Sequence, residues 1–284
     1  MKKTPKRNTP ALFAKLFGAA LIAAAVLVSA VFFIYVRPNR CTPILMYHGV
    51  RDDGSSSLFV SPANFSRQMA FLDEKGFSVM TLEDLVKDVK SGISFRPRAV
   101  VITFDDGYED NYINAFPVLY KRGMSATIFL PTAQISRDKG YLTWDQARVM
   151  AKGGIDFGAH TRNHAYLPDI KDKEELLGEV EGPRRDIEAN LGSPARFFCY
   201  PAGAFNEDSK KAVIEAGYEG ALSTNRGRSR SNKDVFELNR VKVTDSDMTR
   251  PMHFSAKISG YYNVFRKLGG KSKASWEDDK GGSQ

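Results

Sequence analysis

The sequence is poor in the two residue types that most often form disulfide bonds or structural metal sites. It has two cysteines, Cys41 and Cys199, and only four histidines in 284 residues. Two cysteines are too few for a disulfide framework, so the fold must depend on a hydrophobic core, which a chain of this length can build. The sequence leaves open whether the two cysteines pair with each other.

Acidic residues are absent from the first 40 positions, where seven of the 41 basic residues lie. The rest of the chain carries 34 basic and 33 acidic residues, so the formal net charge of +8 arises almost entirely from the N-terminus. A nearly neutral body argues against a polyanionic partner. We therefore expect no binding to nucleic acid.

Charged residues are also absent from 16–36, a run of 21 residues that is long enough to cross a bilayer as a helix. Because basic residues are denser before this run than after it, we predict a single-pass membrane anchor with a cytoplasmic leader at 1–15 and an extracytoplasmic remainder. The alternative is a signal peptide cleaved after 28–30, which would release a secreted protein beginning at Val31. The segment 266–284 is rich in Gly, Ser and Lys, and we expect it to be disordered.

Short apolar runs alternate with amphipathic segments between residues 42 and 265, which we take as one folded domain. The predicted strands are 43–48, 99–104, 126–130, 155–159, 196–200, 220–224 and 240–243, and the predicted helices are 82–91, 111–122, 144–152, 173–191, 207–216 and one that begins at Pro62. Regular alternation indicates parallel strands joined by crossover helices. Seven or eight strands in this length favour an α/β fold closed into a (β/α) barrel.

Polar residues follow several of these predicted strands. They are His48, Asp105, Asp106, His160 and Tyr200. In a barrel of parallel strands, chemistry gathers at the carboxyl ends of the strands. The adjacent carboxylates of Asp105 and Asp106 repel each other at the end of a buried strand, so a cation, a shared proton or an open loop must accommodate them. An ordinary Asp-Gly turn is the plain alternative.

Two of the four histidines, His160 and His164, lie four residues apart in "GAHTRNH". Two such side chains can converge on one metal ion when a turn separates them, and neutral imidazole suits zinc, cobalt, nickel or iron. Alone, this spacing is also typical of surface or capping residues. Together with the carboxylate pair at another strand end, it favours a divalent metal, with zinc the first candidate.

The motifs "TFDDGY" (103–108), "HTRNH" (160–164) and "YPAG" (200–203) resemble, in this order, those of the polysaccharide deacetylases, carbohydrate esterase family four. The resemblance implies a distorted (β/α) barrel at 42–265 that removes acetyl groups from N-acetylglucosamine polymers. It implies Asp106, His160 and His164 as metal ligands and Asp105 as the general base. By the same resemblance, the backbone N–H of Tyr200 contacts the oxyanion of the tetrahedral intermediate.

The sequence departs from the family pattern at two places. Cys199 lies where many members carry an arginine beside the catalytic aspartate, and we predict that Arg240 of "LNRVKV" supplies the missing guanidinium. The late histidine motif that donates a proton to the leaving amine is also missing. Because His253 follows the last predicted strand, we assign this role to His48, as the resemblance to poly-N-acetylglucosamine deacetylases with an early "YH" suggests.

Three other functions fit parts of the pattern. An O-acetyl esterase of the same fold would use the same residues, and a non-catalytic glycan-binding protein could retain them. A non-haem iron oxygenase also uses two histidines and one carboxylate, but the second aspartate and the strand pattern disfavour it. We therefore expect a membrane-anchored hydrolase of the cell envelope acting on poly-N-acetylglucosamine, peptidoglycan or chitin-like oligomers.

Overall fold

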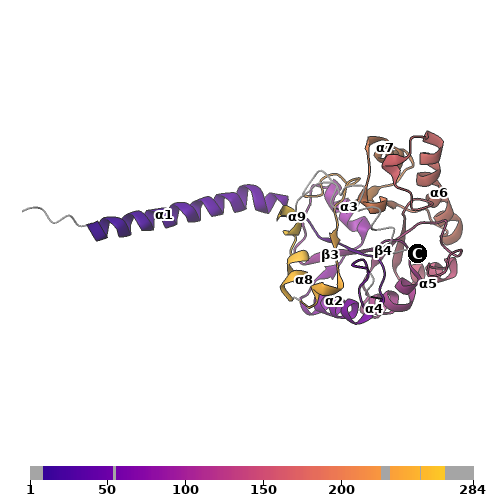
Figure 1. Cartoon of the computed structure of the whole chain (residues 1–284), viewed down its shortest axis with the longest axis horizontal. Coiled ribbons are helices and arrows are strands. Elements are labelled where there is room, and N and C mark those ends of the chain that lie inside the picture. The colour runs from indigo at the N-terminus through magenta and orange to yellow at the C-terminus, as the bar shows by residue number, and fades with distance from the viewer. Residues whose placement is uncertain (1–8, 54–55, 225–230, 250, 266–284) are drawn as a thin grey trace, which may run out of the picture. The chain divides into compact units, whose positions relative to one another are not determined.

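A computed structural model describes residues 9–53, 56–224, 231–249 and 251–265 of the chain (Figure 1). The chain divides into two compact units, Met1–Asn39 and Arg40–Gln284. The predicted disordered tail at 266–284 and the first eight residues of the predicted leader lie outside the described residues.

The described part of the first unit is a single helical segment. Helix α1 spans Thr9–Val31 and continues as a wide π turn at Phe32–Val36 and a 3-10 turn at Arg37–Asn39. The stretch Phe13–Asn39 is long and apolar enough to cross a membrane. A membrane anchor and a signal sequence both satisfy this criterion.

The second unit is built on one parallel sheet of eight strands with the order β7-β6-β5-β4-β3-β1-β8, in which the short strand β2 pairs with β3. The strands are β1 (Ile44–Tyr47), β2 (Ser78–Val79), β3 (Ala99–Phe104), β4 (Ala126–Leu130), β5 (Ile155–Ala159), β6 (Phe197–Cys199), β7 (Gly220–Leu222) and β8 (Val241–Lys242). The predicted (β/α) barrel architecture is confirmed as a curled, distorted sheet. The structure adds β2, which the sequence did not predict.

One segment near the end of the domain contacts both edges of this sheet. Leu238 donates its backbone N–H to Ala221 at 3.0 Å, and Arg240 donates to Thr224 at 2.8 Å, so this part runs along β7. The next residues form β8, which pairs with β1 through Leu45 and Val241. Arg240 therefore lies where the chain passes from one edge of the sheet to the other.

Helices surround the sheet, as Figure 1 shows for α2, α4, α5, α6 and α7. The helices of this unit are α2 (Pro62–Glu74), α3 (Leu82–Lys90), α4 (Phe116–Arg122), α5 (Trp144–Lys152), α6 (Lys173–Leu191), α7 (Glu207–Glu215), α8 (Pro251–Lys257) and α9 (Tyr262–Phe265). Four of these helices begin with an N-cap whose side chain accepts a backbone N–H of the first turn, namely Ser61, Thr81, Thr143 and Asn206. The predicted helix 111–122 instead begins as a π turn, Asn111–Ala115, because Pro117 has no N–H to donate.

Two clusters of buried side chains lie on the two faces of the sheet. The smaller cluster joins Ile44 of β1, Phe129 of β4 and Leu222 of β7. Because these strands are far apart in the sheet order, their side chains can meet only on the concave face. Val101 belongs to this cluster, and alternation along β3 directs Thr103 and then Asp105 to the same side. The barrel interior therefore receives a carboxylate directly above its apolar residues.

A glycine in the predicted "YPAG" motif holds the end of β6 against the end of β7. Gly203 has a left-handed φ of 64°, and a Cβ at this position would overlap the backbone nitrogen of Thr224. Gly192, at the end of α6, has a φ of 81° and open space around its Cα. The two positions share the backbone conformation and differ in their surroundings.

We predict that Gly203→Ala destabilises the protein more than Gly192→Ala does. The left-handed conformation costs about 1–2 kcal/mol in either variant. Displacing the backbone at Thr224 should add about 1–3 kcal/mol for Gly203→Ala alone. Urea unfolding followed by circular dichroism measures both values, and equal losses would show that the close approach to Thr224 is not required.

Candidate metal centre and active site

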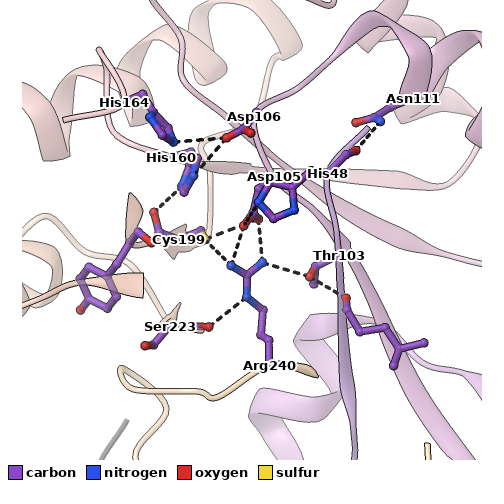
Figure 2. Close-up of polar contacts among 12 residues, drawn as sticks. His48, Thr103, Asp105, Asp106, Asn111, His160, His164, Cys199, Ser223 and Arg240 are labelled. Atoms are coloured by element: carbon purple, nitrogen blue, oxygen red, sulfur yellow. Dashed lines mark hydrogen bonds and ion pairs between the residues drawn. The ribbon is translucent and has the colours of Figure 1, made fainter. Parts of the chain in front are cut away.

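The predicted site residues are brought together at the carboxyl ends of the strands (Figure 2). Asp105 and Asp106 follow β3, His48 follows β1, and His160 follows β5. Asp106 has a left-handed φ of 71° and Gly107 a φ of 64°. This turn sends the two adjacent carboxylates in different directions, so they serve different partners.

The carboxylate of Asp106 faces both histidines of the "HTRNH" motif. Its Oδ1 atom lies 3.5 Å from Nε2 of His160 and 3.3 Å from Nε2 of His164. The ligand atoms of the three residues lie within 4.8 Å of one another. One carboxylate oxygen and two imidazole nitrogens at such separations form a donor set suited to zinc and related divalent metals.

The ring of His160 is fixed by its second nitrogen. Nδ1 lies 2.7 Å from the carbonyl oxygen of Cys199, to which it donates its proton, so Nε2 keeps its lone pair toward Asp106. Burial, only partly opposed by the charge of Asp105, lowers the pKa of His160 to about 4. The imidazole is therefore neutral near pH 7, as a metal ligand must be.

The surroundings of Asp106 also fit a cation. Its Oδ1 atom is buried and has no hydrogen-bond partner among the described residues. A buried carboxylate oxygen without such a partner is expensive unless a cation compensates it. The residues present therefore fit a divalent metal bound by Asp106, His160 and His164.

The second carboxylate, Asp105, pairs with Arg240. Nη1 and Nη2 of Arg240 lie 2.6 Å from Oδ1 and Oδ2 of Asp105, so the pair is bidentate. The guanidinium is fully buried and also donates from Nε to the carbonyl of Ser223 at 3.0 Å and from Nη1 to the hydroxyl of Thr103 at 3.2 Å. Burial alone would raise the pKa of Asp105, but Arg240 outweighs it and the pKa lies below its ordinary value. Asp105 is thus held as a carboxylate.

Cys199 lies beside this ion pair as an uncharged thiol. Its sulfur accepts a hydrogen bond from Nη2 of Arg240 at 3.1 Å, and its S–H donates to Oδ1 of Asp105 at 3.6 Å. Burial raises the pKa of Cys199 well above its ordinary value, so the thiol stays protonated. Cys199 and Cys41 are both buried as thiols, so the disulfide that the sequence left open is not formed.

His48 lies on the other side of Asp105. Nε2 of His48 is 3.8 Å from Oδ2 of Asp105, and Nδ2 of Asn111 donates to the carbonyl of His48 at 2.8 Å. Burial lowers the pKa of His48, although the charges of Asp106 and Asp105 oppose this change. The imidazole therefore lies within the electrostatic influence of both carboxylates.

Comparisons with known proteins agree with this geometry. A family model described as "Polysaccharide deacetylase" matches residues 93–221. YxkH of Bacillus subtilis (strain 168), which is named as a polysaccharide deacetylase, is 33% identical over 206 residues that cover 71% of each chain. The chain belongs to the polysaccharide deacetylase family.

A curated relative and a solved structure extend the comparison of this deacetylase family member. The poly-beta-1,6-N-acetyl-D-glucosamine N-deacetylase of Staphylococcus aureus (strain MSSA476) is 24% identical over 198 residues, which cover 66% of this chain and 68% of that protein. The structure of the Streptococcus pyogenes deacetylase PplD in complex with acetate has a TM-score of 0.69 at 24% identity, and covers 76% of this chain and 97% of that chain. The last comparison shows that the barrel fold is shared.

The geometry restricts the role predicted for Tyr200 in this family member. Its backbone N–H donates to the carbonyl of Leu222 at 3.0 Å, as part of the pairing between β6 and β7. An oxyanion could use this N–H only by displacing that hydrogen bond. The side chain is fully buried and stacks on Phe205 with ring centroids 5.0 Å apart. His253, the alternative proton donor, lies exposed on α8.

The sequence did not single out Asn111, whose amide fixes the carbonyl of His48. The polar residues of "GYEDN", immediately after the carboxylate pair, could have indicated a role for Asn111. In the structure, the neighbouring Asp110 accepts the backbone N–H of Val50 at 2.9 Å. These two residues tie the loop after β1 to the loop after β3. They position His48 without contacting its ring.

We predict that Arg240→Met destabilises the protein by about 3–5 kcal/mol at neutral pH, because the buried carboxylate of Asp105 loses its partner. The double variant Asp105→Asn with Arg240→Met removes the unpaired charge and should recover more than half of this loss. Urea unfolding measures both variants. A single variant as stable as the wild type would show that Asp105 does not need Arg240.

The same variant should show a definite pH dependence. In the wild type the pKa of Asp105 is lowered, so the stability from the ion pair is present above the unfolded pKa of about 3.9 and is lost as pH falls through the folded pKa. Without Arg240, burial raises that pKa, and the variant instead loses stability as pH rises. The gap between the two proteins should shrink from about pH 7 to about pH 4, and the acid limb of the pH–rate profile should move upward. A gap independent of pH would contradict this account.

Proposed function

We propose that the protein is a metal-dependent polysaccharide N-deacetylase that hydrolyses N-acetyl groups on an N-acetylglucosamine polymer. The proposal depends on one observation, namely that the adjacent carboxylates of Asp105 and Asp106 have different partners. Asp106 faces two histidine nitrogens, whereas both oxygens of Asp105 bind the guanidinium of Arg240. Ligands and base thus lie side by side, as metal-assisted hydrolysis requires. The name of the Staphylococcus aureus relative supports a poly-N-acetylglucosamine substrate.

The metal would polarise the acetyl carbonyl and lower the pKa of the attacking water. Asp105 accepts the proton of that water, because its lowered pKa keeps it ionised and its Oδ2 atom retains a lone pair beside the Arg240 hydrogen bond. Arg240 also prevents rotation of the carboxylate, since both guanidinium nitrogens bind it. The base is therefore held in one orientation.

In this proposal His48 donates a proton to the leaving nitrogen from its protonated form, which burial disfavours and the charges of Asp106 and Asp105 favour. Its Nε2 atom is 3.8 Å from Oδ2 of Asp105. The group that accepts a proton from water and the group that donates one to the leaving nitrogen therefore lie next to each other. Amide hydrolysis needs this acid because an amide anion is a very poor leaving group. The Asn111 hydrogen bond to the backbone of His48 keeps the imidazole at the barrel mouth.

The domain arrangement and location follow from the first unit. Residues 16–36 would anchor the protein once across the membrane, and 42–265 would form the catalytic domain on the extracytoplasmic side. Basic residues before the apolar run support this orientation. N-terminal sequencing of the mature protein distinguishes the anchor from a secreted form that begins at Val31.

We predict that Asp106→Ala, His160→Ala and His164→Ala each lose bound zinc and acetate release. Asp105→Asn should keep the metal and lose about 10²–10⁴-fold in rate, since it removes only the base. Elemental analysis gives the metal content, and acetate release is measured from poly-N-acetylglucosamine, peptidoglycan and chitooligosaccharides, with acetylated xylan as comparison. Full activity of metal-free protein would refute the mechanism, and release from xylan alone would identify an O-acetyl esterase.

We predict that His48→Ala keeps the metal and slows hydrolysis of N-acetylglucosamine oligomers by about 10²-fold or more. An aryl acetate should be affected much less, because its leaving group departs without protonation. His253→Ala, on the exposed face of α8, is the matched control and should behave as the wild type. The assignment would be reversed if His253→Ala were inactive and His48→Ala retained full activity on the oligomer.

A further inference from the structure

The loop that carries both histidine ligands has a strained backbone. Thr161 has a φ of 59° and His164 a φ of 56°, both in the left-handed region that non-glycine residues rarely adopt. The loop is attached to the barrel by His160, whose N–H donates to Leu130 at 2.9 Å, and by Arg162, whose carbonyl accepts from Ala133 at 2.9 Å. Such a backbone persists only where surrounding contacts hold it.

The carboxylate of Glu179, on α6, provides those contacts between the two ligands. Oε2 accepts the backbone N–H of Arg162 at 3.0 Å and of Asn163 at 2.9 Å, and Oε1 accepts from Nδ2 of Asn163 at 2.5 Å. Glu179 is only 6% exposed, and the structure describes no ion pair for it. A buried carboxylate needs hydrogen-bond donors, and here all three come from the two residues midway between His160 and His164.

We propose that Glu179 is a positioning residue that sets the geometry of the histidine loop and thereby the affinity of the metal centre. The inference rests on the proposed metal site. Glu179 contacts neither ligand, but it binds successive N–H groups of the turn that separates them. If this carboxylate were only a fold contact, its loss would lower stability and leave metal affinity unchanged. Groups that orient metal ligands typically contribute about 10–100-fold in affinity.

The experiment measures zinc affinity by chelator competition on the full chain. Glu179→Gln keeps the size of the side chain but removes the negative charge to which the three N–H groups donate, and we expect affinity to fall about tenfold or more. Asp172→Ala is the matched control, since it removes the N-cap of the same helix, where Asp172 accepts the N–H of Glu175 at 2.8 Å. It should lower the melting temperature of the metal-free protein without a comparable loss of affinity.

An exchange of partners gives a sharper test. Asn163→Asp places two carboxylates against each other and should also weaken zinc binding about tenfold. In the double variant Glu179→Gln with Asn163→Asp, the introduced amide can donate to the introduced carboxylate, while the amide oxygen accepts the two backbone N–H groups. Affinity should return to within about threefold of the wild type, a coupling that a purely structural loss would not show. The visible spectrum of the cobalt-loaded protein should recover in parallel.

The outcomes separate this inference from the proposed function. Wild-type protein that binds no metal overturns the metal centre and the positioning role with it. A metal-binding wild type, with Glu179→Gln of equal affinity or Asp172→Ala of equally reduced affinity, overturns the positioning role alone. If Glu179→Gln fails to fold, Asn163→Asp and the double variant decide, because wild-type affinity in Asn163→Asp would also overturn it.

Discussion

The ion pair between Asp105 and Arg240 is the constraint on which the rest of the site depends. An ionised carboxylate inside an apolar barrel loses its hydration and needs a charge held at contact distance. Arg240 meets this need from the segment that joins the two edges of the sheet, between its pairing with Thr224 and the start of β8. The segment that connects the two edges of the sheet therefore also carries the cation that keeps Asp105 ionised.

The left-handed turn at Asp106 has an equally direct consequence. Strand alternation directs Asp105 into the concave face, and an ordinary continuation would direct Asp106 to the opposite one. The φ of 71° at Asp106 instead brings its oxygen to the histidines above the strand ends. Two neighbours in sequence thus belong to two chemical environments. Asp105 is neutralised by a guanidinium, whereas Asp106 lacks a hydrogen-bond partner for one oxygen among the described residues.

Much of the fold could be predicted because its signals are local. The strands Ala99–Phe104 and Ala126–Leu130 and the helix Lys173–Leu191 have the predicted bounds, since apolar runs, caps and glycines mark their ends. Strand Ser78–Val79 has only two residues and leaves no pattern to detect. The sequence predicts a regular helix where the structure has the π turn Asn111–Ala115. The helical spacing of apolar residues does not show that Pro117 lacks the N–H of a regular first turn.

The candidate site could be predicted in composition but only partly in geometry. The predicted strand ends indicate which residues meet, because the carboxyl ends of parallel strands lie on the same side of the barrel. The sequence could not show that the Tyr200 N–H is occupied by Leu222, since this depends on how far the β6–β7 ladder extends. It also could not reveal Glu179, because α6 contains several glutamates and the sequence does not distinguish a buried one from those exposed to solvent. Only the three-dimensional fold shows which of them faces a loop.

Charge placement explains why the thiol of Cys199 can occupy this position. A cationic side chain there would lie beside Arg240, and two positive charges would compete for one carboxylate. The neutral thiol instead accepts a hydrogen bond from Arg240 at 3.1 Å and donates its own S–H to Oδ1 of Asp105 at 3.6 Å, beside the two guanidinium hydrogen bonds. Beside Cys199, the negative charge of Asp105 therefore faces the positive charge of Arg240. An arginine at position 199 would need a second buried acid to balance its charge. A neutral residue at 199 is therefore required as long as position 240 is an arginine.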